Sequence, residues 1–488
     1  MKSIIPSSAT SAPGLLVSFL PVAMLLTFLA GIIIFAGADA ISEYSPYSLL
    51  CAALTAVALS LAGKTLSKRG LIIGIRRSAK QILPAVPMLV CIAMVATTWM
   101  LSGVVPVLIS FGLNVLSPTF FLAISCAVCG VISILTGSSW STIATIGVAF
   151  MGIGTVMGIP AGWVAGAIIS GAYFGDKVSP LSDTTVIASS SCGVDLFTHI
   201  RYLMITTVPS IAIALLVFTI AGFNIDISGE IENTEILSLL GANFNLTPWV
   251  LVIPAVTLTL IALRVHTLLT LFISSMLGLA GIFIFQPGIV DHLGITGLSS
   301  GISATLALLW NETTFSTGHE LFDSLVTTSG ILGMMSTIAL VLSAMLFGSA
   351  MIGTGMLSTI THTITRHIRR RFPLVTATAA SGLFLNSCTA DQYLSIIIGG
   401  NMFRNAYRRC GLESRLLSRT LEDSVSVTSV LIPWNSCGVT QSSVLGVSTL
   451  VYFPFCVFNY LSPLITVAIS LFGFKIRQTM TAPTLAKV

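Results

Sequence analysis

The stretch Gly175-Asp176-Lys177-Val178-Ser179-Pro180-Leu181-Ser182-Asp183-Thr184-Thr185 interrupts a long apolar region of the chain. It combines two carboxylates, one ammonium group and four hydroxyls with a proline, which breaks a helix. Ionisable groups are costly inside a membrane and usually serve a function there, although a solvated connection between helices is a simpler alternative. We therefore take this stretch as the first candidate for a binding site.

The composition of the whole chain defines the environment of this stretch. Its 488 residues are 55% hydrophobic and only 8% charged, with a mean hydropathy of +0.99. Soluble domains carry about a quarter charged residues, so the composition predicts an all-α polytopic membrane protein. The first apolar run, Leu15 to Gly37, spans about 23 residues, which is too long for the core of a signal peptide and long enough for a retained first helix.

Basic residues lie in blocks, and these blocks predict the topology. They fall at residues 64–80, 366–371 and 404–419 and in the tail from Lys475. Because loops on the cytoplasmic side are rich in Lys and Arg, we place these blocks and the N-terminus in the cytoplasm of a multi-pass protein of the cell inner membrane. A net charge of +5 concentrated in this way gives no indication of nucleic-acid binding.

The longest polar interval lies near the middle of the chain. Residues 223–247 contain four acidic side chains and no Lys or Arg. We interpret this interval as an acidic external loop between a first transmembrane repeat, residues 1–222, and a second, residues 248–488. About 10 to 13 transmembrane helices are expected in the two repeats together.

The two halves present the same polar features in the same order. Each has a hydroxyl-rich break, at residues 136–142 or 386–392, followed later by an Asp with hydroxyls and a proline. Within the second feature, Asp176-x-Val178-Ser179 corresponds to Asp423-x-Val425-Ser426. Repeats whose corresponding helices are interrupted by polar residues are typical of secondary transporters, which bind their cargo near the midplane of the membrane.

The residues at these breaks suit a hard monovalent cation, which prefers oxygen ligands. A buried Asp is disfavoured as an anion by desolvation and favoured by a bound cation, so one carboxylate can hold either Na⁺ or a proton. The expected Na⁺ ligands are the carboxylates of Asp176, Asp183, Asp391 and Asp423. Neutral oxygens are expected from Ser138, Ser139, Ser179, Thr184, Thr185, Asn386, Thr389, Ser426 and Asn435.

Other chemistries are less well supported by the sequence. There is no Walker sequence for ATP, so an ion gradient is the expected energy source and no cofactor is expected. An intramembrane aspartyl protease could pair Asp176 with Asp391 or Asp423, but Tyr173-Phe174 precedes Gly175-Asp176 in place of the G-x-G-D pattern. A serine protease could use Ser138 or Ser139, but none of the six His residues lies in a clear hydrophobic span as its base. We expect no enzyme activity. Lys177 is expected to be a counter-ion or a charge at the cytoplasmic rim.

Several motifs together resemble the NhaC family of bacterial sodium/proton antiporters. They are found at residues 171–185, 193–200, 136–140, 391–395, 418–424, 433–435 and 437–438, and cover most of residues 130 to 460. The resemblance implies an inner-membrane exchanger of the ion transporter superfamily, with two inverted repeats that each contain a re-entrant hairpin and a broken helix. It also implies exchange of Na⁺ or Li⁺ for H⁺.

Three positions depart from the pattern expected for this family. Val186 lies where an Asn is expected, Ser336 lies where a Trp is expected, and residues 347–352 lack the Glu expected near Ile352. Loss of a carboxylate and an amide leaves an alternative open, namely a Na⁺- or H⁺-coupled exchanger of a small organic acid or amino acid in the same fold. The expected partners are the lipid bilayer, sodium ions and protons, with a small organic solute in the alternative and a homodimer as a further possibility.

Overall fold

The computed structural model describes residues 13–37, 40–63, 65, 68–83, 85–225, 230–292, 298–365, 368 and 370–476. Within these ranges the protein is helical, and the β-type pairing is an isolated bridge between Thr313 and Thr328. Seven of these helices are long and apolar enough to cross a membrane, or up to 10 if each bent helix pair forms one span. This confirms an all-α polytopic protein. The upper number of spans, 10, equals the lower end of the range of about 10 to 13 expected from the sequence.

The helices of the described residues run through the whole fold with short connections. The first part of the chain forms α1 Leu15–Ala36, α2 Ile41–Ala62, α3 Lys68–Ile82, α4 Ala85–Leu101, α5 Val104–Val115, α6 Pro118–Thr136, α7 Ser139–Thr142, η1 Ile143–Gly147, α8 Val148–Val156, α9 Ala161–Val178, α10 Asp183–Cys192 and α11 Leu196–Asn224. The second part forms α12 Glu230–Asn243, η2 Pro248–Leu251, α13 Val252–Ala262, α14 Thr267–Phe285, α15 Pro287–His292, α16 Leu298–Trp310, α17 Glu320–Val326, α18 Gly330–Gly333, α19 Met335–Gly353, α20 Met356–Thr365, α21 Arg371–Thr389, α22 Gln392–Arg409, α23 Ser414–Leu421, η3 Glu422–Ser426, η4 Ser429–Leu431, α24 Ser436–Leu445, α25 Thr449–Tyr452, η5 Phe453–Phe455 and α26 Val457–Phe472.

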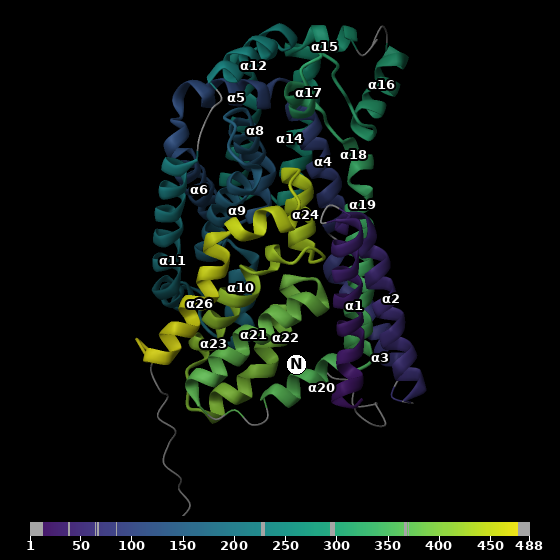
Figure 1. Ribbon diagram of the computed structural model, residues 1–488, viewed down its shortest axis with the longest axis vertical. Coiled ribbons are helices and arrows are strands. Elements are labelled where there is room, and N and C mark those ends of the chain that lie inside the picture. The colour runs from purple at the N-terminus through teal and green to yellow at the C-terminus, as the bar shows by residue number, and fades with distance from the viewer. Residues whose placement is uncertain are drawn as a thin grey trace, which may run out of the picture.

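The first two helices and α19 form a side bundle next to the main body (Figure 1). Leu25, Leu49 and Phe347 are among the residues that fill its core. The larger core lies between α4 to α9, α11 and α14 and continues into the C-terminal helices. Segments far apart in sequence therefore lie side by side, with the second half of the chain packed against the first.

A bent helix pair follows the basic helix α3. α4 and α5 meet at an angle of 65°. Between them Gly103 has φ +86°, a left-handed conformation that favours glycine. The bend leaves backbone carbonyl groups without a partner in the helix. One of them, the carbonyl of Ser102, accepts a hydrogen bond from Gln286 Nε2 at 3.1 Å.

Close packing of α6 on α9 positions the break that follows α9. A Cβ on Gly171 would lie 2.0 Å from the carbonyl oxygen of Cys126, and one on Gly175 would lie 2.3 Å from that of Gly130. Two glycines four residues apart allow the backbones of two helices to approach in this way. Cys126 and Cys129 are buried at this contact, where they act as small packing residues.

The acidic interval is a helix over much of its length, so its prediction as a loop is wrong for residues 230–243. Ile236 and Leu240 are buried, and their spacing of four residues places them on one face of α12, while Phe244, directly after the helix, is buried as well. This apolar face packs into the main core, which stabilises a helix that the acidic residues alone do not suggest. Asp226 lies outside the described residues.

Candidate functional site

The polar stretches found in the sequence are four interruptions at which one helix ends and another begins. α7 begins after Ser138, α10 after Ser182, α22 after Asp391 and α24 after Asn435. In each case the side-chain oxygen of that residue accepts a hydrogen bond from a backbone N–H of the helix that follows. A Ser, Asp or Asn at this position satisfies an N–H group that the helix leaves unpaired. The same residue types that interrupt the apolar sequence therefore start the new helices.

The first two interruptions contact each other through Asp176. The backbone N–H and the hydroxyl of Ser139 both donate to Asp176 Oδ2, at 3.2 and 2.7 Å. A Cβ on Gly137 would lie 2.6 Å from the Cβ of Leu181, so the two breaks pack closely. Asp176 is 8% exposed, and its carboxylate is held at the start of α7 from the end of α9.

The third and fourth interruptions are joined in the same manner by an amide. Asn435 Nδ2 donates to the carbonyl of Asn386 at 3.1 Å, and Ser436 N donates to that of Ala390 at 2.8 Å. Asn386 in turn donates through Nδ2 to the carbonyl of Val425 in η3 at 2.7 Å. This carbonyl lies in a π-helix, a local distortion that is frequent at functional sites.

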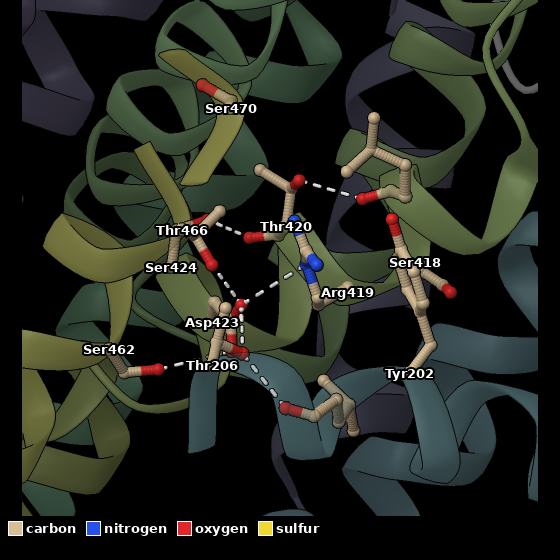
Figure 2. Close-up of polar contacts among 12 residues, drawn as sticks. Tyr202, Thr206, Ser418, Arg419, Thr420, Asp423, Ser424, Ser462, Thr466 and Ser470 are labelled. Carbon is tan, nitrogen blue, oxygen red and sulfur yellow. Dashed lines mark hydrogen bonds and ion pairs between the residues drawn. The ribbon is translucent and has the colours of Figure 1, made fainter. Parts of the chain in front are cut away.

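Asp423, in the same π-helix, is the centre of a buried polar cluster (Figure 2). Thr206 of α11 donates to both carboxylate oxygens at 3.1 and 2.9 Å, and Ser462 of α26 donates to Oδ1 at 3.2 Å. Thr466 also donates to Oδ2. The ammonium group of Lys177 forms an ion pair with Asp423 and donates to Ser462 at 2.7 Å. Asp423 therefore receives a full set of donors from α9, α11 and α26.

Of the two roles expected for Lys177, the structure shows that of a counter-ion. Its side chain is 1% exposed, and its ammonium nitrogen lies 5.4 Å from the centre of the Phe458 ring. The pair connects the end of α9 to η3, which belong to opposite halves of the chain. A buried pair of this kind is stable only when hydrogen bonds satisfy the remaining polar atoms, as the hydroxyls do here.

Arg419 was assigned from the sequence to a cytoplasmic basic block, and the structure instead buries it completely. Its guanidinium carbon lies 4.5 Å from the centre of the Tyr202 ring, and its Nε lies 3.9 Å from Asp423 Oδ2. None of its three nitrogens has a hydrogen-bond partner among the described residues. The spacing of four residues between Arg419 and Asp423 places both on one helix face, a signal that the sequence did contain.

The other predicted residues are mostly buried at the breaks. Thr389 donates to the backbone of Asp391 at 3.0 Å, and Asp391 accepts at Oδ1 from Leu394 N at 2.7 Å. Four more of the predicted ligands are buried, namely Ser179, Thr184, Thr185 and Ser426, and Ser138 is half-buried. Asp183 differs from the other three predicted Na⁺ ligands because its side chain is exposed at the first residue of α10.

Sequence reasoning did not select five polar residues that the structure places at the centre. They are Thr206, Arg419, Glu422, Ser462 and Thr466. Glu422 precedes Asp423 and is completely buried. The hydroxyls of α11 and α26 lie in apolar helices without a motif, so only their contacts identify them. Together the breaks offer carboxylates, hydroxyls and amide oxygens, which are the ligands that a hard cation prefers.

The chain is similar in sequence to known antiporters. The model of the Na⁺/H⁺ antiporter family matches residues 171–474. The chain is 37% identical over 386 residues to the Na⁺/H⁺ antiporter NhaC of Alkalihalophilus pseudofirmus, covering 79% of this chain and 80% of the relative.

Two further relatives carry names that include organic solutes. The malate-2H⁺/Na⁺-lactate antiporter of Bacillus subtilis is 33% identical over 379 residues, or 76% of this chain and 78% of the relative. The arginine/ornithine antiporter ArcD of Halobacterium salinarum is 33% identical over 462 residues, or 94% of this chain and 92% of the relative. The family match and these identities over most of each chain show that this protein is a transporter and belongs to the Na⁺/H⁺ antiporter family.

Proposed function

We propose that the protein exchanges Na⁺ or Li⁺ for H⁺ across the bacterial inner membrane. One observation carries the proposal: four interruptions between helices place the buried carboxylates of Asp176 and Asp391 beside hydroxyl and amide oxygens. Such a set of ligands suits Na⁺, and a desolvated carboxylate can bind a proton in its place. An ion gradient supplies the energy, so no cofactor is required.

The cation ligands in this proposal are the oxygens at the four breaks. Asp176 and Ser139 belong to the first pair of breaks, and Asp391 and Thr389 to the second. Asp423 already has the Lys177 ammonium as its cation partner in this structure, so binding of Na⁺ at Asp423 requires Lys177 to leave or to lose its proton.

The distribution of charge supports a cytoplasmic N-terminus. In Figure 1 the start of α1, the basic helix α3 and the connection from α22 to α23 lie toward one end of the molecule, and the acidic helix α12 lies at the other end. Basic residues are enriched on the cytoplasmic side of membrane proteins.

A division into repeats at residues 1–222 and 248–488 is part of the same proposal, supported by the matching order of the breaks. The homodimer expected from the sequence is also part of the proposal, and native mass spectrometry of the purified protein tests it.

The proposal is tested in inverted vesicles from a host that lacks its own antiporters. Addition of NaCl or LiCl to respiring vesicles should raise the pH of the lumen, as followed with a pH-sensitive dye. Asp176→Asn should abolish this response. The exposed residue Asp195, which starts α11, provides the matched control because Asn is an equally good residue at a helix start. Asp195→Asn should therefore exchange as the wild type does.

A second candidate function is exchange of a small organic acid or amino acid. It is favoured by the fully buried guanidinium of Arg419, which has no hydrogen-bond partner among the described residues and suits a carboxylate ligand. Two relatives named as organic-solute antiporters support it further. If an expressed and folded protein gives no response to Na⁺ or Li⁺, uptake of labelled amino and carboxylic acids by vesicles loaded with unlabelled solute decides for this function.

A further inference from the structure

Glu422 is a completely buried carboxylate that the rest of the polar cluster does not use. It is 0% exposed, and neither Oε1 nor Oε2 has a hydrogen-bond partner among the described residues. It lies at the first position of the π-helix η3, beside the saturated Asp423. An unpaired anion in a buried position is unstable, so this carboxylate requires either a proton or a cation.

Uncharged oxygens surround Glu422 from two separate parts of the chain. The hydroxyls of Ser426, four residues further along η3, and of Thr184 in α10 are the uncharged groups that act on its carboxylate. Ser426 Oγ is itself buried without a partner. The Asn386 side chain, which donates to η3 through Nδ2, also has a buried Oδ1 without a partner. Glu422 and Ser426, four residues apart in η3, therefore both have buried oxygens without a partner among the described residues.

Neighbouring charges do not neutralise Glu422. The charged and titratable groups that act on it from packed helices are Lys177 and Asp176 of α9 and Cys192 of α10. The Lys177 ammonium is already bonded to Asp423 and Ser462. Asp176 acts on Glu422 as a further negative charge, which increases the attraction for a cation.

We propose that Glu422, Ser426 and Thr184 form a binding site for a monovalent alkali cation. The inference rests on the proposed Na⁺/H⁺ exchange and adds to it the position of a cation. The site lies between η3 of the second half and α10 of the first half, so occupation of the site links the two halves of the protein.

The test measures Na⁺ binding to the purified full chain in detergent. Binding of ²²Na⁺ and the rise in melting temperature on replacing choline chloride by NaCl are compared for wild type, Glu422→Gln and Glu413→Gln. A ligand that binds only the folded state raises its melting temperature. Glu413, half-buried and paired with Arg415 at the start of α23, is the matched control.

The wild type and Glu413→Gln should bind Na⁺ and be stabilised by it. Glu422→Gln should bind more than about tenfold more weakly and show no Na⁺-dependent rise. In choline chloride it should melt at or above the wild-type temperature, because the substitution removes an unpaired buried charge. Ser426→Ala and Thr184→Val each remove one oxygen and should weaken Na⁺ binding by about tenfold. These two variants decide the result if Glu422→Gln does not fold.

Failure of this inference can be distinguished from failure of the proposed function. If wild-type vesicles exchange Na⁺ for H⁺, and Glu422→Gln and the two hydroxyl variants bind ²²Na⁺ as the wild type does, the site is overturned and the proposed function stands. If the wild type neither exchanges nor binds Na⁺, both are overturned.

Discussion

Glu422 and Asp423 are consecutive, fully buried carboxylates in one π-helix, yet their surroundings are opposite. Asp423 faces an ammonium group and three hydroxyl donors, whereas Glu422 has no hydrogen-bond partner among the described residues. Consecutive side chains on a helix point roughly a quarter of a turn apart, so the two residues face different neighbouring helices. Burial alone therefore does not identify a cation ligand, because the donors around a carboxylate decide whether it has room for one.

The largest expected effect comes from breaking the Lys177–Asp423 pair. Asp423→Asn leaves the Lys177 ammonium buried without a carboxylate, which should cost about 3 to 5 kcal/mol of stability. Lys177→Met should cost a similar amount because it leaves the opposite charge unpaired. The loss of stability in each single variant is measured by unfolding of the purified proteins. The double variant Lys177→Met/Asp423→Asn should be more stable than either single variant, and an additive loss would contradict a direct pair.

A smaller loss is expected from removing one donor to Asp423. Thr206→Val keeps the side-chain shape and removes a hydroxyl that donates to both carboxylate oxygens. Hydrogen bonds to charged groups are worth about 1.5 to 3 kcal/mol, so the variant should unfold more easily by about that amount.

The neighbouring residue provides a matched control for this prediction. Thr207 is equally buried, and its hydroxyl has no hydrogen-bond partner among the described residues. Thr207→Val should therefore leave stability unchanged or increase it. Equal losses from Thr206→Val and Thr207→Val would show that the hydroxyls around Asp423 do not stabilise it.

The smallest effect is expected at a carboxylate in contact with water. The backbone N–H of Thr198, at 2.9 Å, together with its hydroxyl, lowers the pKa of the exposed Asp195 below its usual value. The ionised cap therefore stabilises the fold above the usual pKa of Asp, and this contribution is lost as the pH falls through the lowered pKa.

Asp195→Asn keeps the helix cap without its charge, so it isolates the pH dependence. Melting curves of the wild type and of this variant, recorded from neutral to acidic pH, should converge on the acid side. A difference between the two that does not change with pH would contradict the assignment. The comparison also separates this titration from any change at the buried carboxylates, which both proteins share.

Much of the candidate site could be predicted from the sequence because it depends on local chemistry. Ser138, Asp391 and Asn435 interrupt apolar runs, and they start new helices because their side chains cap the backbone N–H groups that follow. The buried face of α12 is indicated by the four-residue spacing of Ile236 and Leu240, although the acidic residues of the same segment favour a solvated loop.

Composition, interrupted helices and motifs by themselves determined that the chain is a polytopic transporter of the Na⁺/H⁺ antiporter family, since each of these features lies in a short segment. Only the tertiary structure decided that Lys177 pairs with Asp423, that Asp183 is exposed and that Glu422 is left without a partner. The physical reason is that desolvation and hydrogen bonding depend on which helices pack together. A sequence gives the charge of a side chain, and the helices around it decide whether that charge is satisfied.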